Sequence, residues 1–177
     1  MSEDHVSIVD IDATSDSAPA LGERLRTWLV ENGIVRQSDA PTFQKIELEP
    51  GPSFSAVLDA ADAGVVPGSV EISVGRRVYD TGGNGVELSC SQCRAHFEPD
   101  DRWFDRVGTW FEGDDAVAYP CPACGFEQRL AEWEGPFAMG FGNVGLTFSD
   151  CPPPSDAFLE RVKQLLGHRV RIVLRHI

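Results

Sequence analysis

The sequence predicts an α+β fold, in which an antiparallel sheet carries helices on one face and a four-cysteine zinc-ribbon module is inserted. Three observations support this prediction. A strand pattern followed by an amphipathic helix occurs near each end of the chain, a further strand pattern closes the sequence, and two C-x-x-C pairs lie in between. A chain of 177 residues, 42% of them apolar, is long enough for one compact domain with a small insertion.

The first half begins with the apolar segment 6–11, which predicts a short buried strand. Apolar residues at helical spacing then predict a helix over 18–31 that ends at Asn32-Gly33; they are Leu21, Leu25, Trp28 and Leu29. Segment 36–68 is punctuated by Pro and Gly, with a short helix expected over 53–63. A strand over 70–74, continued by 77–79 after Gly75, follows before a Gly-rich turn at 82–85.

The last part of the chain repeats the strand–helix pattern. Segment 144–148 predicts a strand, Ser155-Asp156 opens a helix, and segment 170–174 predicts a closing strand. Segment 158–166 aligns with 21–29, so the chain resembles two β-α-β halves. A ferredoxin-like fold, with four antiparallel strands and two helices on one face, satisfies this order. We therefore expect an N-terminal half over 1–89, a zinc-ribbon insertion over 90–133 and a C-terminal half over 134–177.

The strongest chemical signal is the pair of C-x-x-C motifs, whose members are Cys90, Cys93, Cys121 and Cys124. Four soft thiolates on two tight turns suit a closed tetrahedral site, so we expect one structural Zn²⁺ per chain. Gly125 supplies the positive φ that such a turn needs. Paired disulfides or a redox site are the alternative. His96 is a conceivable substitute ligand but is better explained as a surface histidine, and Cys151 as a buried free thiol.

A helix is expected between the two cysteine pairs, because apolar residues recur there behind the capping residue Asp100; they are Trp103, Val107, Trp110 and Phe111. Phe104 lies off this stripe, either exposed or widening the apolar face. Segment 126–133 predicts a strand that leaves the module.

Composition restricts the partners. The formal net charge is −13, and no extended basic stripe is present, so nucleic acid is an unlikely partner and a basic or neutral protein is favoured. No apolar run approaches the roughly 20 residues of a membrane span, and the N-terminal residues are acidic where a signal peptide is basic. We expect a cytoplasmic protein, and the excess of Arg over Lys suggests a bacterial source.

One glycine motif matches a nucleotide-binding pattern without its context. Gly140, Gly142 and Gly145 fit G-x-G-x-x-G, but that motif must open a helix, and here the glycines precede a strand. A G-x-x-x-x-G-K-[ST] phosphate loop is absent from the sequence as well. We expect no nucleotide cofactor.

The second half, 90–177, resembles a group of small bacterial proteins without an established activity. The shared features are the C-x-x-C pair, the C-P-x-C-G turn, the aromatic and Gly-rich stretch 133–141, the run G-N-x-G-L-T-F and the ending L-G-H-x-V at 166–170. Such proteins are often labelled sugar-transport ATPases, a label that the missing phosphate loop contradicts. The resemblance implies no catalytic residue.

Function is predicted only in outline. The four histidines are scattered, and no G-x-S-x-G motif surrounds a serine, so no catalytic residues are assigned. The leading hypothesis is a zinc-stabilised acidic protein-interaction module, for example an inhibitor or immunity-type protein for a basic partner. A zinc-ribbon regulatory protein associated with nucleic acid, or an enzyme with an unrecognised site, is the alternative. The expected partner surface consists of Trp133, Phe137, Met139 and Phe141, which could equally fold into the core.

Overall fold

The structure, a computed structural model, describes residues 4–37 and 45–177. Its elements, in chain order, are β1 (Asp4–Asp10), α1 (Ala18–Glu31), β2 (Val35–Gln37), β3 (Lys45–Pro50), the 3₁₀ turns η1 (Phe54–Val57) and η2 (Ala60–Asp62), β4 (Val70–Tyr79), β5 (Glu87–Ser89), β6 (His96–Phe97), α2 (Asp101–Phe111), β7 (Ala118–Pro120), β8 (Glu127–Arg129), η3 (Leu130–Glu132), β9 (Glu134–Phe137), β10 (Gly140–Ser149), α3 (Asp156–Leu166) and β11 (Val170–His176).

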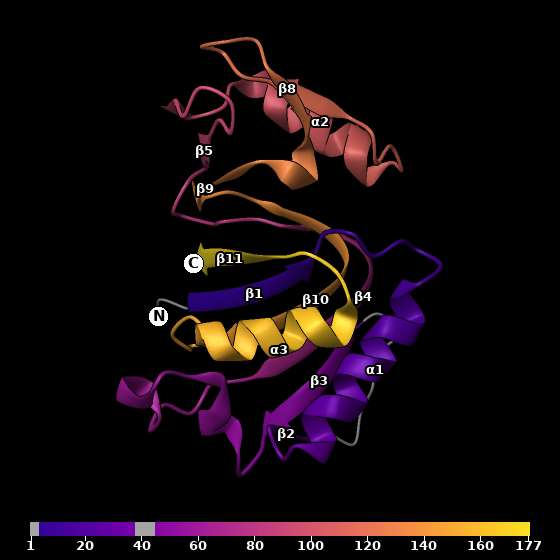
Figure 1. Cartoon of the computed structure of the whole chain (residues 1–177), viewed down its shortest axis with the longest axis vertical. Helices are drawn as coiled ribbons and strands as arrows, with labels where there is room; N and C mark the ends of the chain where they lie inside the picture. Colours follow the sequence, from indigo (N-terminus) through magenta and orange to yellow (C-terminus); the bar gives the residue numbers. More distant parts are fainter. Residues whose placement is uncertain (1–3, 38–44) are drawn as a thin grey trace.

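One antiparallel sheet organises the lower part of the molecule (Figure 1). Within the described residues its strand order is β11-β1-β10-β4-β3-β2, so β11 and β10 from the C-terminal half alternate with β1 and β4 from the N-terminal half in a single sheet. β1 pairs with β10 on one side and with β11 on the other, and β10 pairs with β4, all antiparallel. The α+β class and the antiparallel sheet agree with the prediction.

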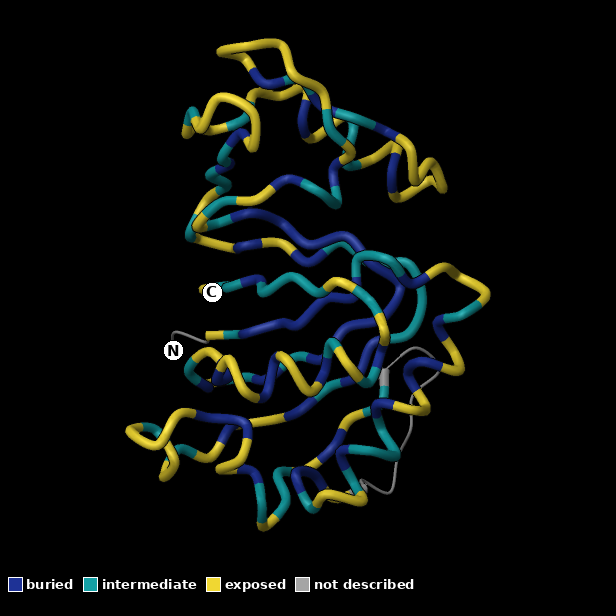
Figure 2. Tube along the Cα trace, in the orientation of Figure 1, coloured by how far each residue is buried: buried dark blue, intermediate teal, exposed yellow. Residues whose placement is uncertain are grey.

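Helices α1 and α3 pack on the same face of this sheet, where they bury the apolar stripes that predicted them (Figure 2). Leu25 and Leu29 of α1 and Phe158 and Val162 of α3 are almost fully buried. Ser155 caps α3 by accepting a hydrogen bond from the Phe158 N–H, and Gly167 ends the helix with φ +71°. Burial of such stripes, at about 25 cal/mol per Å² of apolar surface, stabilises this layer.

Two parts of the sheet and one expected helix differ from the prediction. The hairpin of β2 and β3 extends the sheet beyond β4, and the structure describes it except for residues 38–44. β10 begins at Gly140, four residues before the start of the expected strand. In place of the helix expected over 53–63, the structure has two 3₁₀ turns, η1 and η2. The continuation of β4 beyond Gly75 is confirmed.

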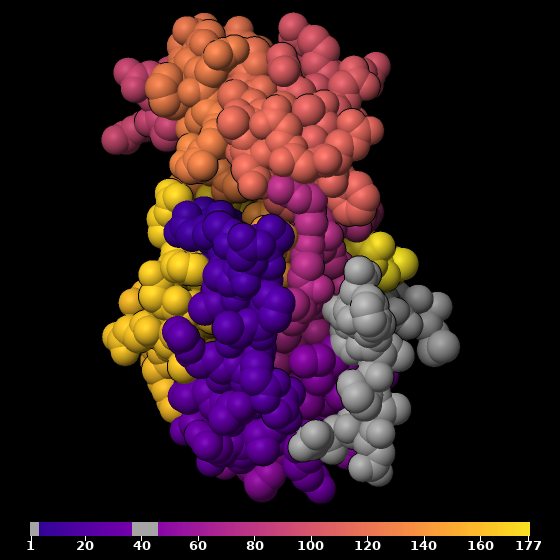
Figure 3. Space-filling view, turned by 90° about the vertical axis from the view of Figure 1, so that its right-hand side faces the viewer, coloured from indigo at the N-terminus to yellow at the C-terminus, as the bar shows by residue number. Residues whose placement is uncertain are grey.

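A second unit, here called the cysteine module, lies above the sheet edge and comprises residues 87–137 (Figure 3). β5 pairs with β6 and β9, and β7 pairs with β8 in a separate hairpin. The paired segments thus extend on both sides of the expected boundaries 90–133. The expected strand over 126–133 is confirmed only at β8, because the chain turns into η3 and reaches Trp133 outside a strand.

The strand β10 joins the two units. Its Phe141 belongs to the core of the cysteine module, whereas its Leu146 and Phe148 belong to the core beneath the helices. In the pairing of β10 with β4, two residues of β4, Gly75 and Arg76, oppose the single residue Asn143, which is the pattern of a β-bulge.

Arg76 lies in this bulge, and its guanidinium carbon is 4.3 Å from the centroid of the Trp110 ring of the module. Arg76 also donates to the Trp110 carbonyl at 2.7 Å and forms an ion pair with Asp115 at 2.5 Å. The module is therefore held to the sheet by both apolar and charged contacts.

Candidate metal centre

Each C-x-x-C pair lies at the tip of a two-stranded hairpin, the first between β5 and β6 and the second between β7 and β8. The backbone hydrogen bonds of the two turns are equivalent. The Arg94 N–H donates to the Cys90 carbonyl, and the Gly125 N–H donates to the Cys121 carbonyl, both at 2.9 Å. Both donors have positive φ, 61° at Arg94 and 75° at Gly125, which confirms the expected role of Gly125.

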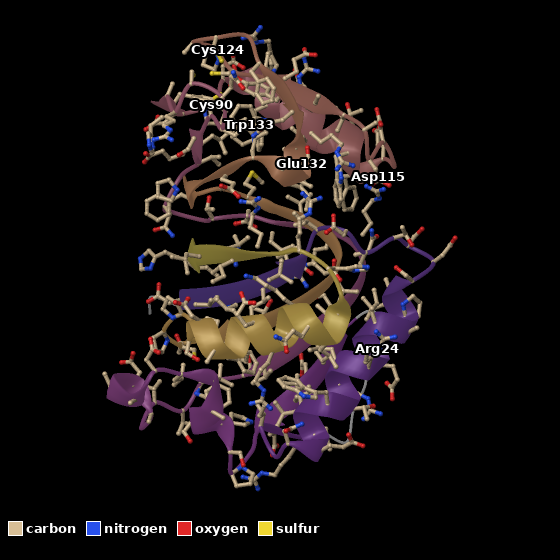
Figure 4. The ribbon with its side chains drawn as sticks, viewed as in Figure 1. Arg24, Cys90, Asp115, Cys124, Glu132 and Trp133 are labelled. Atoms are coloured by element: carbon tan, nitrogen blue, oxygen red, sulfur yellow. The ribbon has the colours of Figure 1, made fainter. Side chains whose placement is uncertain are left out.

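The two turns bring their four sulfur atoms together at the end of the module (Figure 4). All four lie within 4.8 Å of one another. The Cys90–Cys124 sulfurs are 3.8 Å apart and the Cys93–Cys121 sulfurs 3.7 Å apart. A disulfide needs about 2.05 Å, and the cysteines are free thiols. A tetrahedron of thiolates around a metal at about 2.3 Å has edges of about 3.8 Å, so the spacing fits a four-thiolate metal site.

The electrostatics of the cluster differ from one sulfur to the next. Burial raises the pKa of the Cys90 thiol, but N–H groups of Cys93 and Gln92 that donate to its sulfur outweigh burial and lower the pKa to about 7. At Cys124 the Phe126 N–H favours the thiolate, whereas burial and hydrogen bonding with the other thiols raise the pKa to about 12. Four adjacent thiolates repel one another, so a bound cation is what would allow all four to lose their protons.

The remaining candidates for ligation lie elsewhere. His96 is exposed, and its Nδ1 lies 3.1 Å from the Ser89 hydroxyl oxygen and 3.4 Å from the Glu87 carboxylate. Cys151 is buried in the core beneath the helices, as expected. Burial, with the nearby charge of Asp62, raises the pKa of Cys151 to about 11. A buried thiol of such high pKa is a poor nucleophile.

The aromatic segment expected to bind a partner is for the most part core, which corrects that interpretation. Trp133 is 0%, Phe141 1% and Met139 6% exposed. Phe141 packs edge-on against Trp103 and Trp110, with ring centroids 6.0 and 5.3 Å away.

Met139 also contacts the core of the cysteine module. The Trp103 indole N–H donates to the Met139 sulfur at 3.4 Å. Only Phe137 is half-buried, at the wall of a cavity of about 590 Å³ that His5, Cys151 and His176 also line.

Helix α2 instead carries the two most exposed aromatic side chains of the module. The helix and its cap agree with the prediction, because the Asp100 side chain accepts a hydrogen bond from the Arg102 N–H. Trp103 and Trp110 are buried, but Phe111 is 60% exposed and Phe104 52% exposed. The inclusion of Phe111 in the buried stripe was therefore wrong. The off-stripe position of Phe104 was the available sequence signal for its exposure.

The three glycines of the G-x-G-x-x-G pattern lie inside β10, where they allow close packing. A Cβ at Gly142 would lie 2.3 Å from the Asp10 carbonyl oxygen, and one at Gly145 would lie 2.2 Å from the Tyr79 hydroxyl. Within the described residues, no helix combines the length and apolar character needed to cross a membrane.

Comparisons with known proteins leave the family open: no family model matches the chain, and neither a curated protein nor a solved structure matches it significantly.

Proposed function

We propose that this protein is a zinc-stabilised acidic interaction module that binds a basic segment of a partner protein through helix α2. Zn²⁺ is the metal proposed because four thiolates at tetrahedral spacing are its usual closed structural site. Such a site leaves no open coordination position for a substrate, so the metal supplies rigidity rather than chemistry. The rigid module then presents α2 at the surface.

The observation that carries this proposal is the exposed aromatic pair Phe104 and Phe111. The two residues are seven positions apart, so they lie on one face of α2, separated by about 10 Å along the helix axis. Their helical neighbours Trp103 and Trp110 are anchored in the core. The pair is thus held on a fixed support, and aromatic residues, Phe among them, are enriched in protein interfaces relative to the rest of the surface.

Charge indicates the kind of partner. Three acidic residues are exposed here: Asp101 and Asp105 on the same helix and Glu112 at its C-cap. The exposed Arg102 is paired with Asp100 at 2.7 Å. Together with the net charge of −13, these carboxylates favour a basic partner and disfavour nucleic acid. An inhibitor or immunity-type protein for a basic target is one function of this class.

Two further proposals concern the fold type of the sheet unit and the cellular location of the protein. The strands β11, β1, β10 and β4 with α1 and α3 are proposed to form a ferredoxin-like unit to which the β2–β3 hairpin is added; the strand order and the shared helix face support this. Cytoplasmic location is proposed on the basis of free thiols in a metal-type cluster, which suit a reducing compartment.

The partner surface is tested with defined peptides. The zinc-loaded protein is titrated with a fluorescent amphipathic helical peptide of Lys and Leu, and with a peptide of the same pattern in which Glu replaces Lys. The Lys peptide is expected to bind and the Glu peptide not. The double variant Phe104→Ser/Phe111→Ser should weaken binding by about 30-fold or more, because a truncated anchor residue costs about 2 kcal/mol or more.

The control is Phe126→Ser, which removes a third exposed aromatic residue, 39% exposed, from the second cysteine turn. It should bind the Lys peptide as the wild type does. Equal binding by the double variant and the wild type would exclude α2 as the docking surface. Equal binding of both peptides would exclude the charge argument.

A further inference from the structure

A second candidate site, independent of the cysteines, is a cavity of about 340 Å³ beside β11. Four basic residues and two acidic residues line it: Lys163, His168, Arg169, Arg171, Glu132 and Glu134. Glu132 lies where the cysteine module faces the sheet (Figure 4). A predominantly basic lining is unexpected in a chain with a net charge of −13.

Arg171 is the least satisfied charge in this cavity. Its side chain is 13% exposed, and its Nε has no hydrogen-bond partner among the described residues. Its nearest carboxylate, Glu134, is 3.8 Å away and 76% exposed, so solvent screens the pair. Burial lowers the pKa of Arg171. A buried cation without close partners is unfavourable unless a ligand or water completes its hydrogen bonds.

His168 offers a second group to the cavity. Its Nδ1 lies 2.8 Å from the carboxylate of Asp10, whose side chain is 0% exposed. The other Asp10 oxygen accepts hydrogen bonds from the N–H groups of Asp12, at 3.0 Å, and Ala13, at 2.9 Å. The buried carboxylate therefore fixes the orientation of the imidazole, and Nε2 is the ring nitrogen that remains for a ligand.

The other two basic residues are already paired. Arg169 makes two short hydrogen bonds to Asp12, at 2.6 and 3.0 Å, and Lys163 contacts Glu160 at 2.6 Å. Their charges are matched by these carboxylates, so Arg171 and His168 are the basic lining residues that keep hydrogen-bonding capacity. Arginine is well suited to oxyanions because its planar guanidinium donates two parallel hydrogen bonds.

We propose that this cavity binds a phosphate group, with Arg171 as its principal donor and His168 as a second donor or acceptor. This inference goes beyond the interaction function of α2 and does not depend on it. The phosphate comes either from inorganic phosphate or from a small phosphate monoester, two sources that share the same recognition chemistry. A volume of about 340 Å³ leaves room for more than the phosphate group alone.

The test is isothermal titration of the zinc-loaded full chain with inorganic phosphate, phenyl phosphate and acetate in chloride buffer. Both phosphates should bind more tightly than acetate, and tighter binding of the ester would identify a monoester as the ligand. Arg171→Met should weaken phosphate binding by at least about tenfold, since it removes charge-assisted hydrogen bonds. Glu134→Gln should tighten phosphate binding, because it removes the carboxylate nearest to Arg171.

The matched control is Arg36→Met, which changes the net charge equally at an exposed position on β2, the edge strand of the sheet opposite β11. It should leave phosphate binding unchanged. The proposal would be overturned if neither inorganic phosphate nor phenyl phosphate bound, or if acetate bound more tightly than both. It would also be overturned if the wild type and Arg171→Met bound phosphate equally. If Arg171→Met does not fold, the Glu134→Gln result decides, and unchanged or weaker binding then contradicts the site.

Discussion

Replacing Cys121 by serine is expected to release the metal and unfold the cysteine module. Structural zinc contributes on the order of 10 kcal/mol in isolated zinc fingers, comparable with the whole stability of a typical domain. The module's core contains three of the chain's four tryptophans, Trp103, Trp110 and Trp133, all at most 3% exposed. Unfolding should therefore shift the tryptophan fluorescence strongly to the red.

The control for this variant is Cys151→Ala, which removes the cysteine outside the cluster. It should retain the metal and the wild-type fluorescence maximum. Wild-type metal content and fluorescence in Cys121→Ser would show that the four sulfurs do not act as one ligand set.

Truncating Phe141 to alanine is expected to cost about 3 to 5 kcal/mol of stability. Phe141 is 1% exposed, and it belongs to the module core although β10 carries it into the sheet. Its loss leaves a cavity beside Trp103 and Trp110 and weakens the junction of the two units. For a chain of this size each kcal/mol lowers the melting temperature by about 2 to 4 °C.

Phe111→Ala provides the comparison, because it removes the same side chain from a 60% exposed position. Thermal unfolding should change little in that variant. A small change in Phe141→Ala, or equal changes in the two variants, would contradict the burial of the aromatic segment.

Local patterns predicted the parts of the structure that depend on local physics. The apolar stripes of α1 and α3 needed only helical periodicity, and the cap at Asp100 needed only its side chain. The four sulfurs could be grouped because each C-x-x-C turn fixes two of them. Gly125 could be assigned a positive φ because the second turn requires it.

The misplaced features depend on contacts between distant segments. Phe141 and Met139 are buried because α2 covers them, which their own sequence neighbourhood does not encode. Phe111 satisfies helical spacing but lies at the end of α2, beyond the part that the module covers. The pairing of His168 with Asp10 joins residues 158 positions apart, and a lone histidine gives no sign of such a partner.

The most direct test of the account is native mass spectrometry of the purified protein, combined with X-ray absorption at the zinc edge. We expect one zinc per chain, bound by four sulfurs at about 2.3 Å. A metal-free protein whose Cys90, Cys93, Cys121 and Cys124 are joined in disulfides, or a zinc bound by nitrogen or oxygen ligands in their place, would contradict it.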